Sequence, residues 1–143
     1  MGEKARVLVV ANRTAESDEL LKALTKRVEK GPAQFFLVVP STPRGPSSLL
    51  DMNSGGANAE EHLSGALRRW HEAGIEVEGE IGDPDALAAA QDAANASKFD
   101  EAIVSTLPKH LSKWLHLDLP HKVAHATGLP VEHVSASEAR TAA

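Results

Sequence analysis

A short segment near residue 110 carries the side chains best suited to hold an anion. Within five consecutive positions the chain has Lys109, His110, Ser112 and Lys113. An ammonium group attracts a phosphate as a point charge, and hydroxyl or imidazole groups add directed hydrogen bonds. Two interpretations of this segment stand open: an anion site built from side chains, or an ordinary solvated loop. Trp114, the next residue, would pin the loop to the domain, lie in a subunit interface or shield a bound base.

A second group of polar residues follows the first apolar run of the chain. Asn12, Arg13 and Thr14 come directly after Val7–Ala11, and Thr106 follows a later apolar run. In an open α/β sheet, ligands bind beyond the carboxyl ends of the strands, at the point where the strand order reverses. Arg13 would reach a phosphate there or pair with an acidic loop residue. The candidate nucleotide- or anion-binding residues are therefore Asn12, Arg13, Thr14, Thr106, Lys109, His110, Ser112 and Lys113.

Other chemistry finds little support in the sequence. His121 and His125 would share a helix face and could bind a metal if Asp118 joined them, but no His-Glu-x-x-His pattern is present. There is no cysteine, which excludes disulfides, zinc-thiolate sites and thiol catalysis. Gly55 and Gly56 lack the Lys-Ser/Thr of a P-loop, and no Gly-x-Ser-x-Gly elbow occurs. We therefore expect no catalytic residues and no metal site.

Composition narrows the class of protein further. The chain has 143 residues, of which 42% are hydrophobic and 24% charged, as in an ordinary globular domain. The net charge of −5 opposes non-specific nucleic-acid binding, which needs a basic face. No apolar run is long enough for a membrane span. We expect one cytoplasmic domain over residues 1–143 that binds neither nucleic acid nor a membrane.

Strands and helices alternate along the chain and would position these residues. Apolar runs predict strands at 7–11, 35–39, 102–104 and 131–134, of which the first two are expected to be buried, and alternation predicts a strand with one wetter face, as at a sheet edge, at 75–81. Helical spacing and capping signals predict helices at 17–30, 59–73, 85–97 and 121–127. This order predicts an α/β fold, a doubly wound parallel sheet with helices on both faces.

The connecting segments carry more specific expectations. Asp83 is expected to cap the third predicted helix, with Pro84 at its first position. The Ser-, Pro- and Gly-rich segment 41–59 predicts a flexible loop, residues 106–120 a polar loop, and residues 135–143 a frayed tail. Arg68 and Arg69 are expected on the wet side of their helix.

The layout resembles the universal stress protein family from about residue 6 to residue 134. Two landmarks carry the likeness: Gly82-Asp83-Pro84 after the middle strand, and Gly128-Leu129-Pro130-Val131 before the last one. The resemblance implies an adenine-nucleotide-binding fold, a five-stranded sheet of strand order 3-2-1-4-5. It also implies a homodimer, formed through the last strand, Val131 to Val134.

The same resemblance implies a degenerate nucleotide-binding motif. Nucleotide-binding members have an aspartate where this chain has Asn12, and glycines where it has Thr106 and Lys109. Their third glycine falls near residues 117–119, yet no glycine occurs from Lys98 to Thr127. A backbone cradle for phosphate needs residues that allow positive φ and close approach.

Three functions follow in order of preference. The first is a non-enzymatic, universal-stress-like binding or regulatory module in the stress response, acting through protein partners with a degenerate nucleotide motif. The alternative is an ATP- or AMP-binding protein that uses side-chain cations in place of the glycine loop. The third is an electron-transfer or small-enzyme domain of the same doubly wound class, which a bound flavin would reveal.

Overall fold

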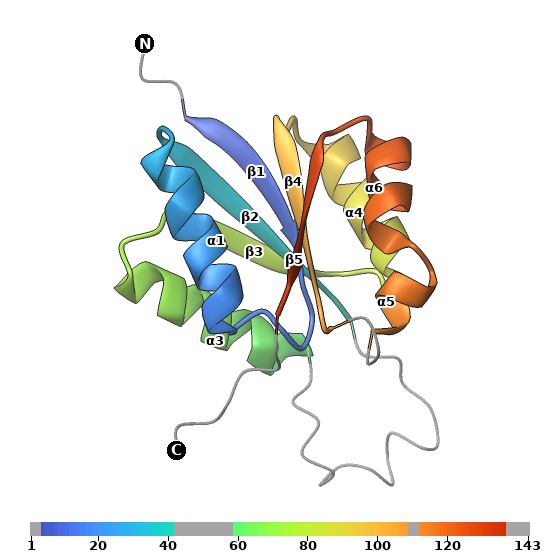
Figure 1. Ribbon diagram of the computed structural model, residues 1–143, viewed down its shortest axis with the longest axis horizontal. Coiled ribbons are helices and arrows are strands. Elements are labelled where there is room, and N and C mark those ends of the chain that lie inside the picture. Colours follow the sequence, from blue (N-terminus) through green and yellow to red (C-terminus); the bar gives the residue numbers. More distant parts are fainter. Residues whose placement is uncertain (1–3, 42–58, 109–111, 137–143) are drawn as a thin grey trace, which may run out of the picture.

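A five-stranded, all-parallel sheet forms the centre of the fold (Figure 1). The computed structural model describes residues 4–41, 59–108 and 112–136. Its strands are β1 (Ala5–Val10), β2 (Ala33–Pro40), β3 (Val77–Gly82), β4 (Glu101–Thr106) and β5 (Val131–Ser135). They lie in the order β3-β2-β1-β4-β5. The predicted fold class and strand order are confirmed, with strand ends shifted by one or two residues.

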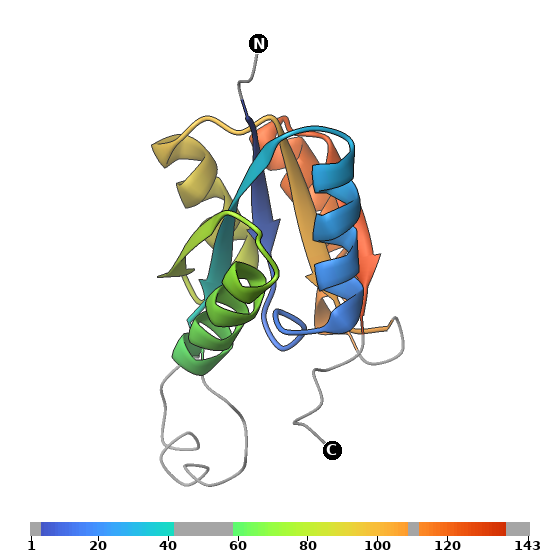
Figure 2. The same cartoon turned by 90° about the vertical axis from the view of Figure 1, so that its left-hand side faces the viewer.

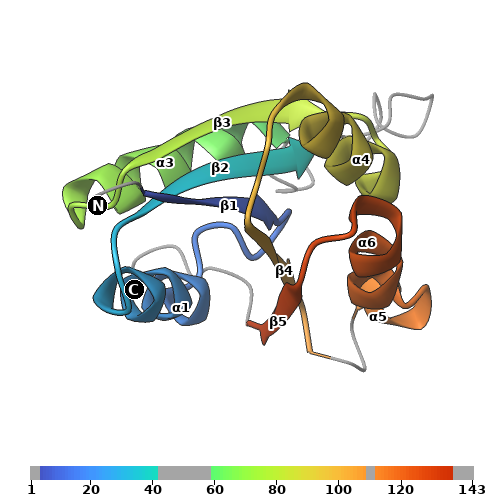
Figure 3. The same cartoon turned by 90° about the horizontal axis from the view of Figure 1, so that it is seen from above.

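Helices cover both faces of the sheet. They are α1 (Asp18–Glu29), α3 (Ala59–Glu72), α4 (Ala86–Ala96), α5 (Lys113–His116) and α6 (Leu119–Thr127). Figures 2 and 3 show α1 and α3 on one face, with α4 and α6 on the other. Each face has its own apolar cluster. No helix in the described part of the chain is both long and apolar enough to cross a bilayer.

The central position of β1 explains its unbroken apolar sequence. Val9 pairs with Leu37 of β2 on one side and with Ile103 of β4 on the other. Because helices cover both faces of the sheet, the side chains of β1 on either face are buried. All of Val7 to Val10 are 0% exposed. At the edge, β3 alternates buried Val77 with exposed Glu78, as the pattern predicts.

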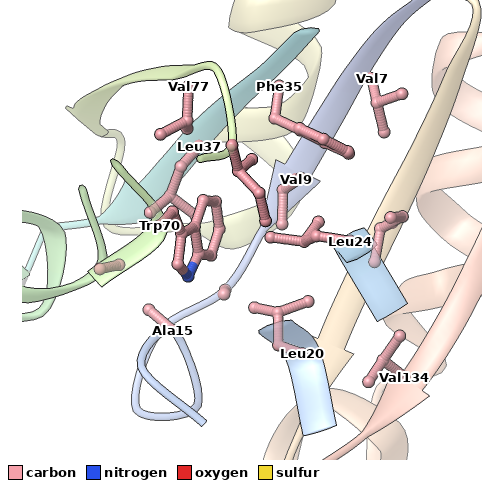
Figure 4. Packing of buried hydrophobic residues seen from close by; sticks show 14 of the residues in the cluster. Val7, Val9, Ala15, Leu20, Leu24, Phe35, Leu37, Trp70, Val77 and Val134 are labelled. Atoms are coloured by element: carbon pink, nitrogen blue, oxygen red, sulfur yellow. The ribbon is translucent and has the colours of Figure 1, made fainter. Parts of the chain in front are cut away.

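The larger core lies between the sheet and the helices α1 and α3. Figure 4 shows Trp70 of α3 with side chains of the sheet and of α1 around it, among them Phe35, Leu20 and Leu24. All four side chains are buried. The indole Nε1 of Trp70 has no hydrogen-bond partner among the described residues. Trp70 therefore holds α3 on the sheet mainly through its apolar area.

The start of α4 differs from the prediction. Asp85, and not Asp83, caps the helix: its Oδ1 accepts a hydrogen bond of 2.9 Å from the amide of Leu87. Asp83 acts one step earlier, since its Oδ1 accepts from the amide of Asp85 at 2.8 Å. Pro84 therefore precedes the cap. Each of the two aspartates accepts a hydrogen bond from the amide two residues further on, and the second of these bonds marks the start of the helix.

The segment predicted as a polar loop at 106–120 contains helical structure. The hydroxyl of Ser112 accepts a hydrogen bond of 3.1 Å from the amide of Leu115 and so caps the short helix α5. Helix α6 begins at Leu119 rather than His121, because Pro120 fits the first turn, where no N–H partner is needed. Asp118 between them has a left-handed backbone, φ 57.

The expected loop at 41–59 and the expected frayed tail at 135–143 lie mostly outside the described residues. The residues of these segments that the structure describes belong to regular structure or bond to it, so both predicted segments begin or end differently from expectation. The amide of Ser41 donates to the carbonyl of Gly82 at 3.0 Å, and Ala59 begins α3. Ser135 belongs to β5, and the amide of the buried Ala136 donates to the carbonyl of Thr106 at 2.8 Å. Sheet-type hydrogen bonds hold Ser41, Ser135 and Ala136 in place, and Ala59 belongs to the first turn of α3.

Candidate functional site

A pocket of about 270 Å³ opens at the carboxyl ends of β1 and β4. These strands are neighbours in space although two strands separate them in the chain, so the strand order reverses here. Open α/β sheets place ligands at this point. Among the described residues, eight line the pocket: Asn12, Arg13, Thr14, Ser105, Thr106, Leu107, Ser112 and Trp114.

The structure brings together five of the eight candidate site residues. Asn12, Arg13, Thr14, Thr106 and Ser112 all line the pocket. The remaining three are Lys109, His110 and Lys113, from the segment that was expected to supply cationic side chains. Lys109 and His110 lie outside the described residues, and for Lys113 the structure describes only the backbone, at the start of α5.

Successive turns carry the chain from β1 into α1 and set the first wall of the pocket. The amide of Ala15 donates to the carbonyl of Asn12 at 3.1 Å, and the amide of Ser17 donates to that of Thr14 at 3.0 Å. The hydroxyl of Ser17 then caps α1 by accepting from the amide of Leu20 at 3.1 Å. These bonds fix Thr14, which is 2% exposed.

Arg69 of α3 anchors the same turn from the side. Its Nη1 donates to the carbonyl of Glu16 at 2.8 Å, and its Nη2 pairs with the carboxylate of Asp18. Arg69 is therefore half-buried and engaged, contrary to the expectation of a solvated side chain, whereas Arg68 is exposed as expected. The helix pattern could not reveal this, because both partners lie 51 or more positions away.

A pair of buried hydroxyls forms the floor of the pocket. The Oγ1 of Thr14 and the Oγ of Ser105 lie 2.6 Å apart, and their residues are 2% and 1% exposed. Ser105 is absent from the predicted site residues. From sequence its hydroxyl suggests only a nucleophile, and no base lies near it in the chain. Its polar side chain at the end of an apolar strand was the available signal.

Thr106 has two hydrogen-bond partners next to the pocket. Its Oγ1 lies 2.9 Å from the carbonyl oxygen of Leu107, to which it donates. The same oxygen lies 2.8 Å from the Nε2 of His133 on β5. Thr106 is 2% exposed, so these contacts hold its side chain in a fixed position.

Trp114 and Leu107 provide the apolar part of the lining. Trp114 is partly buried and packs on the apolar cluster beneath α4 and α6. This contact is the pin expected for Trp114. Trp114 also contributes to the lining of the pocket.

The histidines of α6 form a contact of a different kind. Nδ1 of His121 lies 3.2 Å from a carboxylate oxygen of Asp118, and both side chains are largely exposed. His125 lies one turn further along the same helix and is exposed. Among the described residues, no group of three His, Asp or Glu side chains is placed to hold a metal ion.

Comparisons with known proteins address the fold. No protein-family model and no curated protein sequence matches the chain. A universal stress family protein of Arabidopsis thaliana, solved with AMP bound, superposes with a TM-score of 0.64 over 93% of this chain and 92% of its own, at 14% identity. The chain has the universal stress protein fold.

Two further solved structures share the universal stress protein fold with this chain. One, from Archaeoglobus fulgidus in complex with dAMP, has a TM-score of 0.60 and 15% identity over 94% of this chain and 100% of its own. The other, in complex with cAMP, has a TM-score of 0.55 and 20% identity over 93% and 98%. The resemblance predicted from the sequence is thus confirmed for the fold.

The pocket lining includes a side chain where the resemblance implied a glycine. At the position that the resemblance assigned to the first glycine, Thr106 places a buried, hydrogen-bonded side chain beside the pocket. A glycine there would leave only backbone. Hydroxyl groups therefore occupy space that backbone amides would otherwise line.

Proposed function

We propose that this chain is a non-enzymatic, cytoplasmic binding or regulatory module that takes an adenine mononucleotide in the pocket between β1 and β4. The observation that carries the proposal is the pocket itself, at the reversal of strand order, with a buried hydroxyl pair and Arg13 in its lining. Three solved proteins of the same fold hold AMP, dAMP or cAMP. Side chains would here replace the glycine loop.

The hydroxyl pair supports an anionic ligand. Thr14 and Ser105 carry two hydroxyl protons, and the 2.6 Å bond between them uses one. The second proton is left to donate to another acceptor. Arg13 beside it supplies a permanent positive charge and several N–H donors. A phosphate oxygen matches both groups.

The size and the apolar lining support a small nucleotide. The pocket volume of about 270 Å³ lies just below the usual range for small-molecule sites, roughly 300–1000 Å³. Trp114 and Leu107 offer an apolar surface for a base. A mononucleotide matches this volume better than a dinucleotide.

The lining supports binding rather than catalysis. The eight lining residues that the structure describes include no carboxylate, thiol or imidazole. The imidazole of His133 touches Thr106 from outside the lining, but Thr106 donates its proton to the carbonyl of Leu107. A general base would have to accept that proton. The proposed module therefore acts by changing its surface when the ligand binds.

Calorimetry with AMP, cAMP, ATP and adenosine tests the proposal. We expect AMP to bind in the micromolar range and Arg13→Gln to weaken it about tenfold or more, as for loss of a charged hydrogen bond. Arg68→Gln is the matched control, because Arg68 is exposed on α3 and does not line the pocket. Adenosine should bind more weakly than AMP and respond less to Arg13→Gln.

Two outcomes would overturn the proposed ligand. Equal losses in Arg13→Gln and Arg68→Gln would place the nucleotide elsewhere on the surface. No heat of binding at millimolar nucleotide would show a degenerate pocket, and the module would then act through protein partners alone.

A further inference from the structure

His133 links the edge of the sheet to the pocket. It lies on β5 opposite Val104 of β4, so its side chain shares a face of the sheet with Val104 and with Thr106, two positions further on. Across this step its Nε2 comes within 2.8 Å of the Oγ1 of Thr106. Nothing in the sequence pattern singles out His133, because it lies 27 positions from its partner.

The proton on Thr106 decides the roles in this contact. A threonine hydroxyl has one proton and two lone pairs. The Oγ1 of Thr106 lies within hydrogen-bond distance of a carbonyl oxygen, which only accepts, and of Nε2 of His133. Both bonds form together only if Thr106 donates to the carbonyl of Leu107 and His133 donates to Thr106.

We propose that His133 is a positioning residue that keeps the hydroxyl proton of Thr106 on the carbonyl of Leu107, so that Thr106 offers the pocket a lone pair. This inference rests on the proposed function in so far as it concerns a ligand. The pocket then has one end that donates hydrogen bonds and another that accepts them. The pair Thr14–Ser105 has a proton to donate, whereas Thr106 accepts.

The two ends define the class of ligand more closely. The donor end and Arg13 match a phosphate oxygen, as argued above. The acceptor end matches an O–H or N–H group, such as a ribose hydroxyl or the amino group of a base. The pocket therefore selects phosphate esters that also carry a hydrogen-bond donor, and disfavours a dianionic simple alkyl phosphate, which has none.

The tautomer of His133 provides a test that needs no ligand. Long-range ¹H–¹⁵N NMR correlations of the neutral imidazole report which nitrogen carries the proton. We expect the proton on Nε2 of His133 in the whole protein. A neutral ring with its proton on Nδ1 would overturn the inference, because a bare Nε2 could only accept from Thr106.

A double-mutant cycle provides the second test, with AMP binding as the readout. We expect His133→Leu to weaken AMP about threefold to tenfold, as for one hydrogen bond, and to have no further effect in a Thr106→Val background. His133→Gln should restore binding, since an amide N–H can donate. An equal loss in both backgrounds would show a structural role only.

Glu132→Leu is the matched control for changes to the sheet edge. Glu132 is an exposed neighbour on the same strand and points to the opposite face. A loss of AMP affinity equal to that of His133→Leu would contradict the inference. If the wild-type chain binds no nucleotide, the proposed function fails, while the NMR result still decides whether His133 positions Thr106.

Discussion

The hydroxyl pair Thr14–Ser105 shows how single side chains make this pocket. The two residues lie 91 positions apart, and both side chains are buried at the ends of neighbouring strands. A buried hydroxyl that loses its partner keeps its desolvation cost, whereas two apolar replacements have no such cost. The pair should therefore behave as a unit in stability as well as in binding.

We expect Thr14→Val and Ser105→Ala each to lower the free energy of unfolding by about 1 kcal/mol. The double variant should lose less than the sum of the two, because no hydroxyl is left unpaired. Urea denaturation of all four proteins measures this coupling. Thr25→Val on the exposed side of α1 serves as control and should change stability by less than about 0.5 kcal/mol. Additive losses would show that each hydroxyl finds another partner.

Neighbouring elements approach one another closely at Gly79 of β3 and at Gly65 of α3. A side chain added at these two positions should have different effects on stability. A Cβ atom on Gly79 of β3 would lie 2.7 Å from the carbonyl oxygen of Leu37 and 2.7 Å from a methyl group of Leu63. For a Cβ atom on Gly65 of α3, the three nearest atoms would all belong to the carboxylate end of Glu16. Backbone and core side chains have little room to move, whereas a carboxylate on a flexible side chain can turn away.

We expect Gly79→Ala to lower the free energy of unfolding by about 1–3 kcal/mol, because α3 must move off β3. Gly65→Ala should leave stability unchanged or raise it by up to about 1 kcal/mol, the helix preference of alanine over glycine. Thermal and urea unfolding of the two variants provide the comparison. A loss in Gly65→Ala as large as in Gly79→Ala would mean that Glu16 is held rigidly over α3.

At the scale of the whole molecule, β3 and β5 form the two edges of the sheet, and no other described strand pairs with their outer sides. The edge strand β3 carries Glu78 and Glu80, and two copies paired along it would bring these carboxylates together. The other edge strand, β5, carries Val131 and Val134 and a single carboxylate, Glu132. Unpaired edges invite pairing, and charge is a common protection against it. The proposed homodimer through β5 follows from this difference.

We expect the wild-type chain to sediment as a dimer and a Val131→Lys, Ser135→Lys double variant as a monomer. Lysines on both copies of β5 would face one another across a two-fold axis. Glu78→Lys on β3 is the control and should leave the dimer intact. Dissociation by Glu78→Lys alone would place the interface on the opposite edge, and a monomeric wild-type chain would contradict the dimer itself.

The sequence by itself determined the strands, the helices α1, α3, α4 and α6, and the sheet. Val7–Val10 and Phe35–Val39 can be read as buried strands because strand and helix periods are local properties of the backbone. The same reasoning led to Asn12–Thr14 and Thr106 as pocket residues, since parallel strands end at a common edge. The sequence prediction was wrong where two nearby residues were both suited to one role. At the start of α4, for example, Asp83 was the expected cap and Asp85 is the actual one.

Only the tertiary structure decided which polar groups meet. Thr14 is hydrogen-bonded to Ser105, 91 positions away in the chain. Arg69 is likewise bonded to Glu16 across 53 positions, and His133 to Thr106 across 27. A hydroxyl or guanidinium group can bond to many partners, and nothing in its neighbouring residues selects one. Strand register and helix packing make that selection, because they fix which side chains come within the 3 Å or so that a hydrogen bond spans.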